Sequence, residues 1–132
     1  MDKATQEQIC GFLDKAKSKL TTCEEWLAQD KYFDEIASRA YYAAFHAAQA
    51  LLASEGLHAE THQGVVNLFG LHFAKSGKMN PRLGRFLNNL KDDRESADYD
   101  VYSGFERQDA VNAVEEARQF VTEAEAYLKP HL

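Results

Sequence analysis

The chain has 132 residues, of which 45% are hydrophobic and two are proline, and its formal net charge at pH 7 is −6. This length suits a single domain, residues 1–132, and the negative charge argues against indiscriminate nucleic-acid binding. Cys10 and Cys23 fall in one predicted helix, roughly 20 Å apart along its axis, which excludes a disulfide within that helix and favours a reducing compartment.

The first predicted helix covers residues 4–29. Apolar side chains recur there every three or four residues, which is the period of one helix face. They are Ile9, Phe12, Leu13, Ala16, Leu20, Cys23 and Leu27. Asp30 and Asp34 are candidate caps for the helix that follows. We therefore expect a long helix with one buried face and a short connection after it.

The second predicted helix, residues 33–54, is apolar on nearly all sides. Its alanines are Ala37, Ala40, Ala43, Ala44, Ala47, Ala48 and Ala50. Such a helix is expected at the centre of a bundle, and Gly56 can end it in a left-handed conformation. Its longest uncharged run, residues 40–54, is too short to span a bilayer about 30 Å thick. Since the first residues also lack the apolar core of a signal peptide, we expect a cytoplasmic protein without membrane association.

Three polar side chains interrupt this apolar helix. Arg39 and His46 are seven residues apart and lie on nearly the same face, and Tyr42 falls between them. Polar groups on a buried face are costly unless they are paired or used. The pattern therefore predicts that Arg39, Tyr42 and His46 meet and form or support a polar site.

The rest of the chain predicts three more helices. Thr61 is a suitable N-cap for the third, and Asn80 with Pro81 suits the start of the fourth. The expected helices cover residues 62–75, 81–96 and 106–128, and residues 97–104 are expected to form a turn. Because no alternating strand pattern occurs, we expect an all-α fold, an antiparallel up-and-down bundle of four to five helices.

Charge is distributed unevenly along the chain. Residues 61–91 contain no acid and five bases, which are Lys75, Lys78, Arg82, Arg85 and Lys91. The segments on either side are acidic. One interpretation is a solvated face whose charge is balanced within the fold. The other is a docking surface for an acidic partner, or a phosphate-facing patch in which Lys78, Arg82 and Arg85 attract the ligand.

A second polar cluster, residues 94–100, ends the fourth predicted helix. An antiparallel arrangement could bring Arg94 or Asp98 toward Arg39. A buried arginine requires a carboxylate of matching fork geometry, and we expect Asp98 to pair with Arg39. Breaking such a pair costs about 3–5 kcal/mol, so it can be indispensable to folding without being catalytic.

The same residues permit a catalytic interpretation. Metal-independent RNA cleavage needs a base for the 2′-hydroxyl and a cation for the charge that develops on phosphorus. His46 can serve as acid or base, although a histidine satisfied in the core is the competing interpretation. Arg39 or Arg94 can bind phosphate, and Tyr99 can donate to a phosphate oxygen but is a poor base.

We expect no metal and no cofactor. Glu55, His58 and His62 have suggestive spacing, but they straddle a helix–loop–helix junction and present no single rigid face. His62 is instead expected to bond locally or to face a partner. The chain has no phosphate-cradling glycine-rich loop and no nucleophile elbow.

Three motifs, in order along the chain, closely resemble the HEPN domain superfamily, in particular its small stand-alone prokaryotic branch. The motifs are Ser38-Arg39-Ala40-Tyr41-Tyr42-Ala43-Ala44-Phe45-His46-Ala47-Ala48, Thr61-His62-Gln63-Gly64-Val65-Val66 and Arg94-Glu95-Ser96-Ala97-Asp98-Tyr99. The resemblance covers residues 5–128. It implies a helical bundle, a homodimer, and pairing with a small nucleotidyltransferase, often as a toxin–antitoxin couple. Many members are metal-independent ribonucleases, and others bind nucleotides or act as non-catalytic partners.

The superfamily's ribonuclease motif is an arginine followed, after four to six residues, by a histidine on a late helix. Arg94 matches the arginine by position, but the residue five places later is Tyr99. Arg39 and His46 satisfy the spacing on the second helix, where the motif does not normally occur. This departure puts the classical ribonuclease activity in doubt.

Our leading hypothesis is a dimeric HEPN-like protein that binds RNA or a nucleotide and partners a small nucleotidyltransferase. The alternatives are an active metal-independent endoribonuclease and a purely structural interaction module. Tyr41, Tyr102 and Phe105 are candidate interface aromatics, although core packing explains them equally well.

Overall fold

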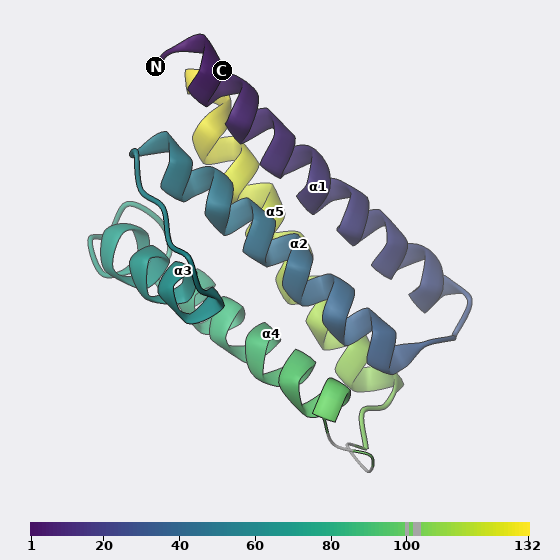
Figure 1. Cartoon of the computed structure of the whole chain (residues 1–132). Helices are drawn as coiled ribbons and strands as arrows, with labels where there is room; N and C mark the ends of the chain where they lie inside the picture. The colour runs from purple at the N-terminus through teal and green to yellow at the C-terminus, as the bar shows by residue number, and fades with distance from the viewer. Residues whose placement is uncertain (100, 102–103) are drawn as a thin grey trace.

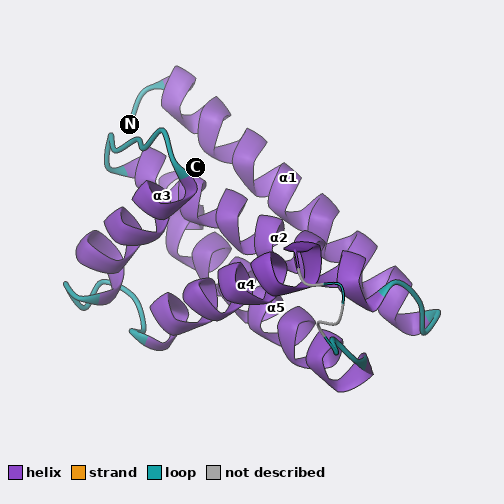
Figure 2. Cartoon of the chain, turned by 60° about the horizontal axis from the view of Figure 1, so that its bottom comes forward, coloured by secondary structure: helices purple, strands orange, loops and turns teal. Residues whose placement is uncertain are grey.

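Five α-helices run up and down the molecule in chain order (Figure 1). The computed structural model describes residues 1–132 except 100, 102 and 103, so the aromatic candidate Tyr102 lies outside the described residues. The helices are α1 (Lys3–Ala28), α2 (Phe33–Ser54), α3 (His62–Phe69), α4 (Arg82–Tyr99) and α5 (Arg107–Leu128), with a short 3-10 turn, Lys129–His131, at the end. The described part of the chain contains no strand (Figure 2). The predicted all-α antiparallel bundle is confirmed.

Helix α2 lies at the centre of the bundle, between α1 and α4 and against α5 (Figure 1). All seven alanines noted in the sequence are completely buried there. Because an alanine side chain is a single methyl group, the neighbouring helices can approach α2 closely. No helix among the described residues is both long and apolar enough to cross a membrane.

The α1–α2 connection differs from the prediction. The N-cap of α2 is Tyr32 in a left-handed conformation, with φ 61°, and no side chain caps the helix. Asp30 is also left-handed, and it pairs with Arg107 of α5 at 2.8 Å. Asp34 lies in the first turn of α2, where its negative charge interacts favourably with the helix dipole. Tyr32 is placed by packing, because its ring meets that of Trp26 at 5.4 Å.

The predicted caps at Thr61 and Asn80 and the left-handed Gly56 are confirmed. The Thr61 hydroxyl accepts a hydrogen bond from the Gly64 backbone N–H at 2.9 Å, and Asn80 Oδ1 accepts one from the Arg82 N–H at 3.0 Å. Gly56 has the left-handed φ of 70° that was expected of it. A Cβ atom at Gly64 would lie 2.9 Å from Thr61 Oγ1, so the first turn of α3 leaves no room for a side chain there.

Two helices differ in length from their predictions. The third was predicted to be regular over residues 62–75, but beyond Phe69 it continues as a π-helical turn over Gly70–Ala74. The fourth extends to Tyr99, into the predicted turn. This extension puts Asp98 one helical turn after Arg94 on the same face.

The alanines of α2 generate a stability prediction. Ala44→Leu should lower the free energy of unfolding by about 1–3 kcal/mol, because a larger side chain at this fully buried position forces helices apart. Urea denaturation measures the effect. Ala126→Leu, on the exposed face of α5, is the matched control and should stay within about 0.5 kcal/mol of the unaltered protein. Equal stabilities for the two variants would contradict the close packing of α2.

Candidate functional site

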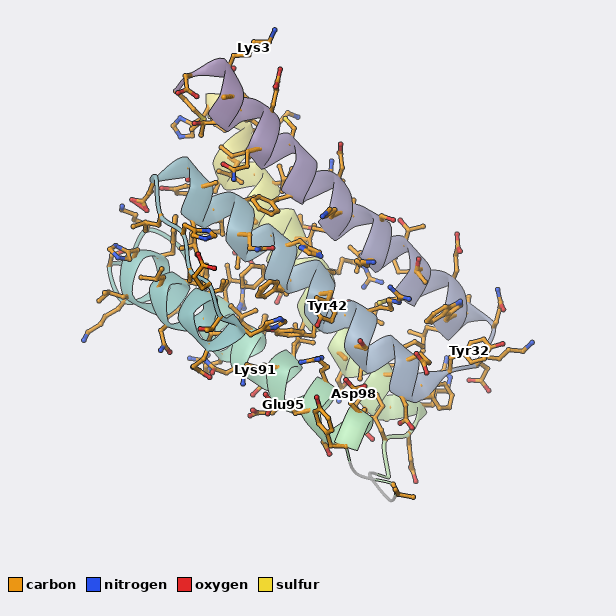
Figure 3. All side chains as sticks on the ribbon, viewed as in Figure 1. Lys3, Tyr32, Tyr42, Lys91, Glu95 and Asp98 are labelled. Atoms are coloured by element: carbon orange, nitrogen blue, oxygen red, sulfur yellow. The ribbon has the colours of Figure 1, made fainter. Side chains whose placement is uncertain are left out.

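A polar and aromatic cluster forms where α2, α3 and α4 meet. Tyr41 Oη lies 2.8 Å from His62 Nδ1, and the His62 ring stacks on Phe45 with ring centroids 4.4 Å apart. The Tyr42 ring meets His62 edge-on at 5.7 Å. Figure 3 shows Tyr42 on α2 and, across from it, Lys91, Glu95 and Asp98 along α4. We call Tyr41, Tyr42, His62 and Arg94 the α2–α4 centre.

Arg94 contributes the cation of this centre. Its guanidinium carbon lies 5.7 Å from the centroid of the Tyr41 ring and 5.3 Å from that of Tyr42, which are cation–π distances. Asp98 Oδ2 lies 3.4 Å from Arg94 Nε, as an ion pair one turn apart on α4. The geometry is not that of a hydrogen bond, and the buried Nε has no hydrogen-bond partner among the described residues. Arg94 therefore keeps unused donor capacity.

The bond between Tyr41 and His62 fixes the state of the imidazole. Tyr41 is completely buried, and burial raises the pKa of its phenol, so the phenol keeps its proton. That proton needs an acceptor, and the acceptor in contact is His62 Nδ1. Neutral His62 then carries its own proton on Nε2. The ring is therefore a hydrogen-bond donor on its other side.

The charges around His62 favour this neutral form. Its pKa lies below the ordinary value because of partial burial first, and then because of the positive charges of Arg94 and Lys91. Glu95 acts in the opposite direction, but it is bonded to Lys91 at 2.6 Å. At neutral pH the centre thus presents one guanidinium and one neutral imidazole.

His46 lies next to this centre and has a different partner. Its Nδ1 is 2.9 Å from Gln49 Oε1, and its ring centroid is 6.0 Å from that of Tyr42. An amide oxygen only accepts, so His46 donates from Nδ1 and leaves Nε2 with a lone pair. Its pKa is lowered, mainly by burial. His46 is therefore neutral and basic at Nε2, the reverse of His62.

Arg39 does not reach the centre. Its guanidinium lies over the ring of Trp26 on α1, 5.8 Å from the centroid. The predicted Arg39–Asp98 pair is wrong, because Asp98 pairs with Arg94. The reason is geometric, since Arg39 lies on the side of α2 that faces α1, whereas α4 packs on another side. Tyr42 and His46 do meet, as the helical spacing predicted.

The remaining predicted site residues lie elsewhere. Tyr99, the last residue of α4, is 78% exposed. Lys78 forms an ion pair with Glu55, and Arg82 lies 3.9 Å from Glu123, so part of the basic segment is balanced within the fold. Arg85 is exposed. Their proposed attraction of phosphate stays a prediction.

His62 is the site residue whose role sequence reasoning missed. It was expected to bond locally or to face a partner, but it reaches Tyr41, which is 21 residues away. The signal available in the sequence was its place directly after the Thr61 cap, which fixes it in the first turn of α3. The described residues contain no group of three or more His, Cys, Asp or Glu side chains able to hold a metal ion.

One of the candidate interface aromatics is a core residue, and a second packs against the core. Tyr41 is completely buried within the chain, and Phe105 is partly buried against the hydrophobic core. Highly exposed apolar side chains occur instead around the end of α4, where Tyr99 is 78% exposed and Val101 is 89% exposed.

Comparisons with known proteins show which family and which relatives this chain is similar to. The sequence pattern of the family described as "HEPN domain" matches residues 11–127. A protein of Methanocaldococcus jannaschii named "Putative toxin MJ0605" is 32% identical over 98% of this chain and 95% of its own. A "UPF0332 protein" of Thermotoga maritima is 31% identical over 94% of each chain. A second M. jannaschii protein, "Putative toxin MJ0142", is 25% identical over 97% of this chain and 86% of its own.

The electrostatics of the centre can be tested by titration. Arg94→Met should raise the pKa of His62, because it removes a positive charge that disfavours the imidazolium. NMR titration of the ring resonances measures it. Arg85→Met, on the exposed face of the same helix, should leave that pKa in place. An unchanged His62 pKa in Arg94→Met would contradict the proximity of Arg94 to His62.

Proposed function

The chain belongs to the HEPN domain family, and we propose that it is a toxin-type HEPN protein that binds RNA or a nucleotide at the α2–α4 centre. We further propose that it forms a homodimer and is controlled by a small nucleotidyltransferase partner. The observation that carries the proposal is the guanidinium of Arg94, which lies against two tyrosine rings and whose Nε–H makes no hydrogen bond to a described residue.

The donors at the centre suit a phosphate group. A guanidinium presents its N–H groups in a fork that matches phosphate oxygens, and a charge-assisted bond of this kind is strong. His62 adds a neutral N–H on the ring side opposite Tyr41. The Arg94 side chain retains 21% exposure, so an anion can approach it from solvent.

The aromatic rings suit the other part of a nucleotide. Nucleobases stack on aromatic side chains, and the interaction is tolerant of base identity. Tyr42 is only partly buried, and it lies between Arg94 and His46. A phosphate at Arg94 would therefore bring its attached nucleoside close to an accessible ring.

The partner is inferred from kinship. Two relatives carry the word toxin in their names, and we extend that role to this chain. The family resemblance supplies the homodimer and the nucleotidyltransferase. The exposed side chains of Tyr99 and Val101 offer apolar surface for either contact.

A second candidate function, metal-independent RNA cleavage, is favoured by one observation. Position 99 has no histidine, but His62 and His46 bring two imidazoles to the neighbourhood of Arg94. His46 Nε2 is the group suited to accept a proton from a 2′-hydroxyl, while Arg94 would stabilise charge on phosphorus. Cleavage that persists in excess chelator and disappears in His46→Gln would support this function.

Binding can be measured directly with adenosine monophosphate and with a short oligoribonucleotide. Arg94→Met should weaken both by about tenfold, because a charge-assisted hydrogen bond is lost. Arg85→Met tests the alternative patch in residues 61–91 and should have the smaller effect. A larger loss in Arg85→Met would move the binding surface to that patch, and absence of binding by the unaltered protein would refute the proposal.

The biological role can be tested by expression with and without the chromosomal neighbour of the gene. Expression alone should arrest growth, and co-expression of the neighbour should relieve the arrest. A loss of RNA integrity that accompanies the arrest would favour the cleavage function. Arg94→Met should abolish the arrest while circular dichroism shows an unchanged helical fold. A harmless unaltered protein would instead favour a non-catalytic interaction module.

A further inference from the structure

A second group of cations lies where α1 packs on α2, whereas Arg94 lies where α4 packs on α2. Lys15 and Lys19 of α1, together with Asp14, Ser18 and His46, line an open surface hollow of about 340 Å³. The two ammonium groups outnumber the one carboxylate. The hollow is thus a positively charged concavity in the acid-rich first part of the chain.

Lys15 and Lys19 form no ion pair with a described residue, although each is one helical turn from the other. Like charges at this spacing destabilise a helix. Lys17, on the same helix, does have an acidic partner, because it pairs with Glu125 of α5. Two adjacent cations left without acids around a hollow are an arrangement that an external anion would stabilise.

His46 joins this hollow to the α2–α4 centre. Its ring lines the hollow and lies 6.0 Å from the ring of Tyr42, which in turn lies 5.7 Å from the ring of His62. Cations lie near both ends of this route. Burial lowers the pKa of His46, the hydrogen bond to Gln49 raises it, and Lys15 and Lys19 lower it further, while Arg94 and Lys91 lower the pKa of His62.

The route crosses three helices on one face of the molecule. Helix α2 lies between α1 and α4, and the three are side by side (Figure 1). Helices pack 8–10 Å apart, so the span from α1 to α4 is on the order of 20 Å. That length exceeds one phosphate group and fits a chain of several nucleotides.

We propose that Lys15 and Lys19 form a second phosphate subsite beside His46, and that one single-stranded RNA runs from it across Tyr42 to Arg94 and His62. The inference rests on the proposed function, because the Arg94 end is the site described above. A single strand is favoured over a duplex because its bases are free to stack on Tyr42 between the two cationic ends.

The experiment compares ligands of two lengths at several salt concentrations. The double variant Lys15→Gln with Lys19→Gln removes both charges and keeps helix-forming residues. Its affinity for an oligouridylate of about eight nucleotides should fall about tenfold, and the slope of log affinity against log salt should become shallower by about 1.4. Binding of the dinucleoside monophosphate UpU, which has one phosphate, should not change.

The matched control is Lys31→Gln with Lys129→Gln, which makes the same change in net charge at exposed positions away from the hollow. It should bind the longer oligonucleotide like the unaltered protein. Equal weakening by both double variants, or an unchanged salt slope in the first, would overturn the second subsite. If Arg94→Met weakens binding while the Lys15 and Lys19 variant does not, only this inference fails. If the unaltered protein binds no RNA, both fail.

Discussion

Close packing around α2 is the constraint on which the rest of the structure depends. Its buried alanines let α1, α4 and α5 approach, so the few larger side chains on α2 have to fit the spaces that remain. Tyr41 is completely buried by this arrangement, and its hydroxyl cannot be left without an acceptor. The bond to His62 follows from that requirement. A packing constraint thus positions the polar centre.

The short helix α3 carries His62, the acceptor of this hydrogen bond. Thr61 caps it, and Gly64 admits the cap because a side chain there would collide with the threonine hydroxyl. These two residues fix where the helix begins and therefore where His62 lies. Arg94 then contacts the rings of both tyrosines and, with Lys91, disfavours protonation of the imidazole. The site therefore has two hydrogen-bond donors, the Arg94 guanidinium and the neutral His62 ring. Together they favour the binding of an anion.

The sequence predicted what depends on local interactions. Helix period, the caps at Thr61 and Asn80 and the left-handed Gly56 are all set by residues a few positions apart, and all were confirmed. Sequence reasoning failed for contacts between side chains on different helices. Helical spacing correctly grouped Tyr42 with His46, but it could not say that Arg39 faces Trp26 on α1 while Asp98 stays with Arg94. His62 was missed because its partner is on another helix.

The same lesson applies to charge. The acid-free segment 61–91 looked like the natural place for a phosphate, but Lys78 meets Glu55 and Arg82 approaches Glu123 once the chain is folded. Lys15 and Lys19 belong to the first sixty residues, where acids outnumber bases, and yet they form no ion pair with the residues described. An anion is attracted by charge that the fold leaves uncompensated, not by charge that is dense along the chain. By that criterion Lys15 and Lys19 are better placed to bind an anion than Lys78 and Arg82.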